Sequence, residues 1–166
     1  MFRSILYATD LGLYAPYVLQ HAMTLARAYQ AELYVVHAVE PMGLFAESVL
    51  QTYLDDKTME ELRSKGLSTV MASIEQRVLE GFRDELGELQ QDIEVIRNVR
   101  VIQGDPARVI LEEARKLGVD LLVVGSHSHG GAQDTALGRT ALRVLQLAEI
   151  PVYLVPMLQH RSRADL

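Results

Sequence analysis

Apolar residues along the chain fall into five short runs, separated by longer segments with helical spacing. The runs are residues 3–8, 32–39, 93–102, 120–124 and 151–155, and the first and fourth are continuously apolar, as in strands buried on both faces. Alternation of such strands with amphipathic helices predicts a doubly wound α/β domain. We therefore expect a five-stranded parallel sheet of order 3-2-1-4-5, with helices on both faces.

Several helix boundaries are marked by particular residues. Pro16 suits the first turn of a helix that follows the first strand. Asp105 and Pro106 have the pattern of an N-cap and a first helical position, and Gly118 is placed to end that helix. A further helix is expected from Gly138 to residue 148.

The middle of the chain is less regular. Residues 41–57 carry weak signals, and we expect an irregular connection there. Thr58 and Glu61 have the form of a capping box, which predicts the start of a long amphipathic helix that reaches about Leu89. The domain is expected to span residues 1–157, followed by a polar tail at 158–166.

Composition excludes several classes of protein. The 166 residues suit one domain, and the lack of cysteine rules out disulfides and zinc–thiolate sites. A net charge of −6 argues against nucleic acid and anionic lipid as partners. No apolar run approaches the ~20 residues of a membrane helix, and the N-terminus lacks the plan of a signal peptide, so a cytoplasmic location is expected.

The candidate chemistry lies where the sheet order reverses. In such a sheet, ligands bind outside the carboxyl ends of the strands, here at Thr9-Asp10 and at the loop that begins at Gly125. That loop and the helix after Gly138 supply backbone N–H groups for an anion such as a phosphate chain. Hydroxyl groups and one cation could assist, and these belong to Ser126, Ser128, Thr140 and Arg139.

These motifs resemble the universal stress protein family. The matching segments are Gly125-Ser126-His127 with Gly138 thirteen residues on, the ending 150–155, the opening 5–10 with its Thr-Asp, and the triplets at 104–106 and 118–120. The resemblance implies binding of ATP or AMP, with Mg²⁺ only together with ATP. The candidate binding residues are Ala8, Thr9, Asp10, Ala38, Gly125, Ser126, His127, Ser128, Gly138, Arg139 and Thr140.

The resemblance gives some of these residues particular roles. Asp10 matches an acidic residue near the ribose and the phosphate–metal region, and Ala38 matches a position whose backbone contacts adenine. Two positions depart from the family pattern, because Ser128 replaces the second motif glycine and Arg139 replaces a Ser or Thr. Arg139 either neutralises a phosphate chain or lies across the pocket and replaces it.

Other residues have two readings. Asp10 either helps to hold Mg²⁺ or caps the next turn. His127 and His129 make a poor metal site without a third ligand, and His37 is expected to be a hydrogen-bonded core residue. We found no nucleophile–base pair, so at most slow ATP hydrolysis is expected.

The sequence leaves three functional hypotheses, in descending order. The first is a dimeric stress-response protein that binds an adenine nucleotide and acts on an unidentified protein partner. The second is a stress-induced scaffold that binds no nucleotide, and the third is an enzyme on a related fold. An apolar edge strand invites pairing, and the resemblance implies a homodimer through residues 150–155; alternatively, the tail covers this edge.

Overall fold

The computed structural model has a single parallel sheet at its centre, with the expected strand order β3-β2-β1-β4-β5. It describes residues 1–12, 14–41, 43–61, 72, 75–81, 84, 95–127 and 137–157. The strands are β1 (Ser4–Thr9), β2 (Glu32–Val39), β3 (Ile96–Gln103), β4 (Leu121–Gly125) and β5 (Val152–Val155). Each strand begins within three residues of its predicted start. This agreement is expected, because a short apolar run is most readily buried as a strand within a sheet.

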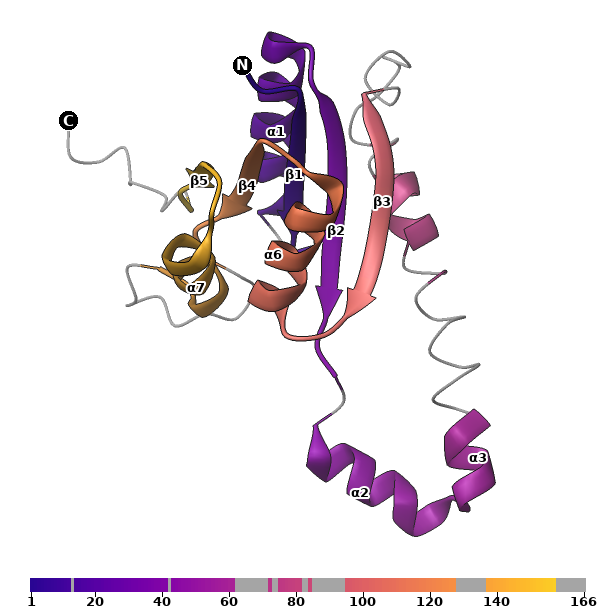
Figure 1. Ribbon diagram of the computed structural model, residues 1–166. Coiled ribbons are helices and arrows are strands. Elements are labelled where there is room, and N and C mark those ends of the chain that lie inside the picture. Colours follow the sequence, from indigo (N-terminus) through magenta and orange to yellow (C-terminus); the bar gives the residue numbers. More distant parts are fainter. Residues whose placement is uncertain are drawn as a thin grey trace, which may run out of the picture.

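Helices cover both faces of the sheet (Figure 1). Helix α1 (Ala15–Tyr29) and a helical segment at 75–81 pack on one face, whereas α6 (Pro106–Leu117) and α7 (Arg139–Leu147) pack on the other. Side chains of β1 alternate between these layers: Ile5 and Tyr7 join the α1 cluster, and Leu6 joins the α6 cluster. Both faces of β1 are therefore buried, which fixes its register at the centre of the sheet.

Helix α6 begins and ends at the residues that the sequence marks. The side chain of Asp105 accepts a hydrogen bond from the Arg108 N–H at 3.1 Å, and Pro106 occupies the first turn. Gly118 ends the helix with φ at 60°, a left-handed conformation that favours glycine. Both predictions are confirmed.

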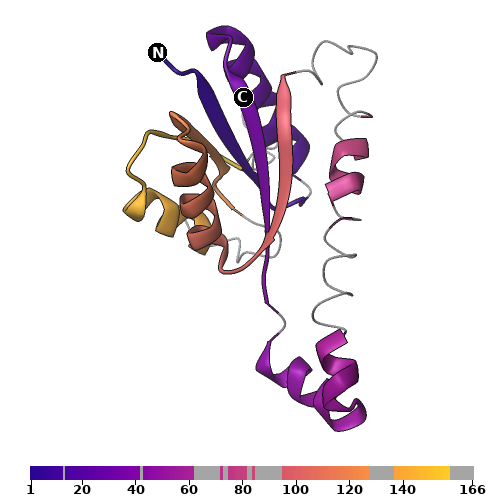
Figure 2. The same cartoon turned by 45° about the vertical axis from the view of Figure 1, so that its right-hand side comes forward.

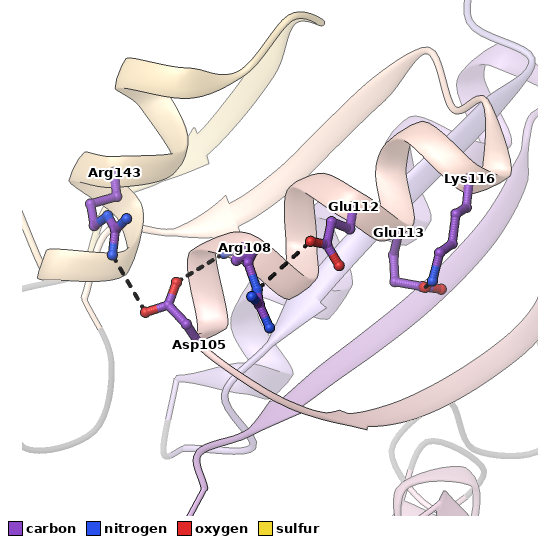
Figure 3. A network of polar contacts seen from close by, with 6 residues as sticks. All are labelled: Asp105, Arg108, Glu112, Glu113, Lys116 and Arg143. Carbon is purple, nitrogen blue, oxygen red and sulfur yellow. Dashed lines mark hydrogen bonds and ion pairs between the residues drawn. The ribbon is translucent and has the colours of Figure 1, made fainter.

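A polar network runs along α6 and holds it to its neighbours (Figure 3). Asp105 also pairs with Arg143 of α7 at 3.4 Å. Near the other end, Glu113 is almost fully buried and accepts from Arg100 of β3 at 2.7 Å and from Lys116 at 3.2 Å. Because this buried carboxylate is paired twice, its burial is compensated, and α6 is fixed to both β3 and α7.

The expectation of an irregular connection over 41–57 is wrong. This segment contains α2 (Leu44–Tyr53), and α3 (Asp56–Glu61) follows. Figures 1 and 2 both place these two helices beyond the carboxyl ends of the strands, away from the sheet. The apolar and polar residues of α2 are less clearly segregated onto two faces than those of α7, so sequence periodicity does not reveal α2.

The helix start assigned to Thr58 is also wrong. Helix α3 begins at Asp56, and Asp55 acts as its cap, because the Asp55 carboxylate accepts from the Thr58 N–H at 2.7 Å. Hydrogen bonds from Thr58 lower the pKa of Asp55. Of the long helix predicted beyond this point, residues 75–81 are helical, and most of the remainder lies outside the described residues.

The two edges of the sheet differ. At the β3 edge, the Glu75 carboxylate accepts from the Val101 N–H at 3.0 Å. At the other edge, β5 pairs with β4 and with no further strand in the described part of the chain. None of the described helices combines the length and apolar character needed to cross a membrane.

Candidate nucleotide-binding site

A cavity of about 320 Å³ opens at the carboxyl ends of the strands, where the sheet order reverses between β1 and β4. Its volume is at the lower end of the ~300–1,000 Å³ typical of small-molecule sites. Residues from seven elements, from the loops that join them and from the chain after β5 line it. They are Tyr7, Ala8, Thr9, Asp10, Tyr14, Tyr17, Val18, Val36, His37, Ala38, Glu40, Pro106, Ile110, Val124, Gly125, Ser126, His127, Gly138, Thr140, Ala141, Val155, Pro156 and Met157.

The structure brings most of the candidate residues together in this cavity. Ser128 lies outside the described residues, and so do His129 and the glycines that follow it. Arg139 is exposed and is not among the lining residues, so its side chain does not fill the cavity. In this structure Arg139 therefore does not lie across the described part of the pocket.

The turn after β1 is shaped by two short-range hydrogen bonds. Thr9 Oγ1 accepts from the Leu11 N–H at 3.1 Å, and Asp10 Oδ1 accepts from the Gly12 N–H at 2.9 Å. A Cβ on Gly12 would lie 2.9 Å from Asp10 Oδ2, so a larger residue at this position would displace the Asp10 carboxylate. Asp10 therefore does cap its turn, which was one of its two readings, and it also lines the cavity.

Ser126 lines the cavity and forms hydrogen bonds with three neighbouring segments of the chain. Its N–H donates to the Val155 carbonyl, and its carbonyl accepts from the Gly138 N–H, both at 2.8 Å. Its side-chain oxygen accepts from the Met157 N–H at 2.8 Å and lies 2.9 Å from His127 Nδ1. The Ser126 backbone therefore connects the end of β5 to the start of α7, and its buried hydroxyl holds the chain after β5.

His37 is placed differently from the expectation. It is hydrogen-bonded, since its Nδ1 lies 2.8 Å from the Thr9 carbonyl, but it is half-buried and lines the cavity instead of lying in the core. A carbonyl only accepts, so Nδ1 carries the proton and donates it. When the ring is neutral, Nε2 is then the nitrogen that accepts a hydrogen bond from a ligand.

The N-terminus of α7 provides the main anion-binding feature. Its N-cap is Gly138, which has no side chain to accept a hydrogen bond from the first turn. The first N–H groups of a helix have no partner within the helix and carry a partial positive charge. Thr140 and Ala141 of this turn line the cavity, so these donors lie at its wall.

Charged side chains in the cavity favour cations over anions. Asp10 and Glu40 contribute carboxylates, and no Lys or Arg is among the described lining residues. A group of three or more metal-ligating side chains is not found in the described ranges. The described side chains of the lining therefore carry no positive charge that would neutralise a triphosphate.

Several lining residues were not predicted from the sequence. Tyr14 and Tyr17 begin α1, where aromatic residues on a helix are usually read as core. Glu40 and Pro106 follow the ends of β2 and β3, respectively. Considering every strand end at the same edge of the sheet would have found these two, whereas no sequence signal separates Tyr17 from a core residue.

Comparison with known proteins agrees with this geometry. The model of the universal stress protein family matches residues 1–156. The chain belongs to the universal stress protein family. Its curated relatives in that family include universal stress protein YxiE of Bacillus subtilis, 29% identical over 93% of this chain and 99% of the relative. A universal stress protein of Thermus aquaticus is 30% identical over 93% and 99% of the two chains.

Solved universal stress protein structures share the fold. Protein MJ0577 of Methanocaldococcus jannaschii has a TM-score of 0.64 at 22% identity, covering 96% of this chain and 99% of its own. UspA of Lactobacillus plantarum has a TM-score of 0.62 at 20% identity, with 93% and 97% covered. A universal stress protein in complex with cAMP has a TM-score of 0.54 at 16% identity, with the same coverages of 93% and 97%.

Proposed function

We propose that this universal stress protein binds an adenine nucleotide in the cavity between β1 and β4. The observation that carries the proposal is the N-terminus of α7, whose N-cap has no side chain and whose first turn lines the cavity. Such a helix end favours an anion without a charged side chain. A similar structure has been solved with cAMP, which supports an adenine-containing ligand.

Other lining residues suit the remaining parts of a nucleotide. His37 Nε2 accepts a hydrogen bond from an N–H such as the adenine amino group, and Ala38 beside it lies at the same end of β2. Gly125, at the end of β4, has no side chain between the sheet and the ribose. Thr140 supplies a hydroxyl at the phosphate end of the cavity.

The carboxylates set the preference among nucleotides. Asp10 and Glu40 repel a bare triphosphate, so ATP is expected to bind with Mg²⁺. AMP carries less negative charge and needs no cation. We expect a binding role in the stress response, with at most slow hydrolysis.

A second candidate function is a dimeric scaffold that binds no nucleotide. Two observations favour it: the described lining has carboxylates without Lys or Arg, and the second motif glycine is replaced by Ser128. In that case, the fold and the edge strand carry the function, and the cavity is not used.

Calorimetric titration with Mg²⁺–ATP, and separately with AMP, tests the proposal. We expect dissociation constants in the micromolar range for at least one nucleotide, and weaker ATP binding when EDTA removes Mg²⁺. Binding of AMP but not ATP would restrict the ligand to monophosphates. No heat of binding with either nucleotide would leave the scaffold function.

We further propose that two copies pair through β5. In the described part of the chain this strand is an open edge, and exposed apolar side chains occur on it and on the helix that precedes it in the sequence: Tyr153 on β5, and Leu142, Leu145 and Leu147 on or at the end of α7. An unpaired strand next to exposed apolar surface favours pairing with an identical strand. Tyr153→Lys should convert dimers to monomers in sedimentation velocity, whereas the similarly exposed Tyr29→Lys should not.

A further inference from the structure

A line of ring contacts begins at the cavity wall. Tyr17 lines the cavity from the first turns of α1 and packs edge-on against His21, four residues later on the same helix face. Their ring centroids are 4.9 Å apart at an interplanar angle of 79°. Any ligand group that contacts the Tyr17 ring therefore acts on His21 through one van der Waals contact.

The same line continues to the edge of the sheet. His21 Nδ1 lies 2.9 Å from the Tyr153 hydroxyl oxygen, and their ring centroids are 5.7 Å apart. Tyr153 belongs to β5 and is 36% exposed. Three side chains thus connect the cavity to the open edge strand, although Tyr17 and Tyr153 are far apart in the sequence.

The backbone of the edge strand makes a second connection. Directly after Tyr153 the chain reaches the cavity, which Val155, Pro156 and Met157 line. The Met157 N–H is held by Ser126, which follows the end of β4. Movement of Tyr153 and occupancy of the cavity therefore affect the same short segment.

We infer that Tyr17, His21 and Tyr153 couple ligand occupancy of the cavity to pairing of β5 with a second copy of the chain. This inference rests on the proposed nucleotide binding and dimerisation. A ligand that packs on Tyr17 holds the ring of His21, and His21 holds Tyr153 in one rotamer. Because that ordering is complete before a second copy arrives, the liganded chain pairs more tightly.

By thermodynamic linkage, nucleotide binding and dimerisation must strengthen each other by the same factor, so the coupling can be measured on either equilibrium. We expect saturating Mg²⁺–ATP or AMP, whichever binds, to lower the dimer dissociation constant at least about fivefold in sedimentation equilibrium. Calorimetry should show the same factor in nucleotide affinity between protein concentrations below and above the dimer dissociation constant.

Two variants interrupt the line at different points without touching the cavity. His21→Leu removes the ring and its hydrogen bond, and Tyr153→Phe removes only the hydroxyl group. His21→Leu should still bind nucleotide and still dimerise, because His21 is neither a lining residue nor part of β5, but the two constants should become independent. For Tyr153→Phe, which changes the pairing strand itself, the readout is the ratio of the dimer constants without and with nucleotide, which should fall to about one. The double variant should lose no more coupling than either single variant, because both changes break the same connection.

Tyr29→Phe is the matched control. Tyr29 lies on α1, as His21 does, and has the same side chain as Tyr153. Its ring contact among the described residues is with Phe2 and not with β5, so the coupling of Tyr29→Phe should equal that of the wild type. Nucleotide binding with no change in the dimer constant would overturn this inference alone, as would full coupling in both Tyr153→Phe and His21→Leu. Failure of the wild type to bind nucleotide would overturn the proposed function and this inference together.

Discussion

Helices α6 and α7 both start at the carboxyl edge of the sheet, but their first turns differ. In α6 the Asp105 carboxylate accepts from the first turn, and Pro106 removes one N–H altogether. In α7 the N-cap is Gly138, and no side chain caps the turn. One fold therefore has two kinds of helix end at this edge: in α6 the N-cap side chain accepts from the first turn, whereas in α7 no N-cap side chain does so, and we propose that a ligand takes its place.

The largest effect should come from giving α7 the cap that α6 has. Gly138 has φ of −68° and ψ of 157°, which any residue can adopt, so Gly138→Asp can place a carboxylate over the first turn. Nucleotide affinity should fall at least about tenfold, about 1.4 kcal/mol, because the carboxylate occupies the donors and repels phosphate. Calorimetric titration measures this change.

Gly138→Asn separates capping from charge. Its amide oxygen caps the turn without repelling an anion, so the loss of affinity should be smaller than for the aspartate. Wild-type affinity in Gly138→Asp would show that the end of α7 does not contact the ligand.

Removing the cap of α6 should have a smaller effect, and only on the free energy of unfolding. Asp105→Ala removes the cap of α6 and its contact with Arg143, and should lower the free energy of unfolding by about 1 kcal/mol. Urea denaturation measures this loss. Nucleotide affinity should be unchanged because Asp105 does not line the cavity; a parallel loss of affinity would contradict the division between the two helices.

The smallest expected effect is on stability and comes from a carboxylate at the amino-terminal ends of the strands. Asp120 Oδ2 accepts from the N–H groups of Arg3 and Ser4 at 2.8 and 3.1 Å, and these bonds lower the pKa of Asp120. Its contribution to stability is therefore complete above the unfolded pKa of about 3.9 and is lost as the pH falls through the lower folded value.

Asp120→Asn should remove this contribution. Thermal denaturation from pH 6 to pH 2 should show a shallower loss of stability on acidification than in the wild type. Glu149→Gln, which changes a carboxylate that is 78% exposed, is the control and should retain the wild-type slope. An identical slope in Asp120→Asn would show that these two hydrogen bonds do not link folding to protonation.

Strands and well-capped helices were predictable from the sequence because their signals are local. The apolar runs of β1 and β4 are typical of strands that are buried on both faces of a sheet. Asp105, Pro106 and Gly118 mark α6 at both ends. Helix α2 was not predictable, because its apolar and polar residues are less clearly segregated onto two faces than those of α7. At α3, Asp55 and Thr58 both suit a cap, and only the backbone geometry decides between them.

The site was predictable where it depends on topology. The switch point correctly places Asp10 and Gly125 at one cavity, because parallel strands end at the same edge. His37 was assigned to the core because a histidine within an apolar strand gives no sign of its depth along that strand. Tyr17 and Tyr153 meet through His21 from opposite ends of the sequence, and no local pattern records such a contact.

The carboxylate of Glu75 on the β3 edge bears on how far assembly can proceed. A sheet with two open edges can add copies at both ends and grow into an open filament. Here one edge carries a negatively charged side chain bound to the Val101 N–H, so a further strand would have to displace it. The proposed pairing through β5 would be isologous and would close after two copies, so the expected assembly is a finite twofold dimer.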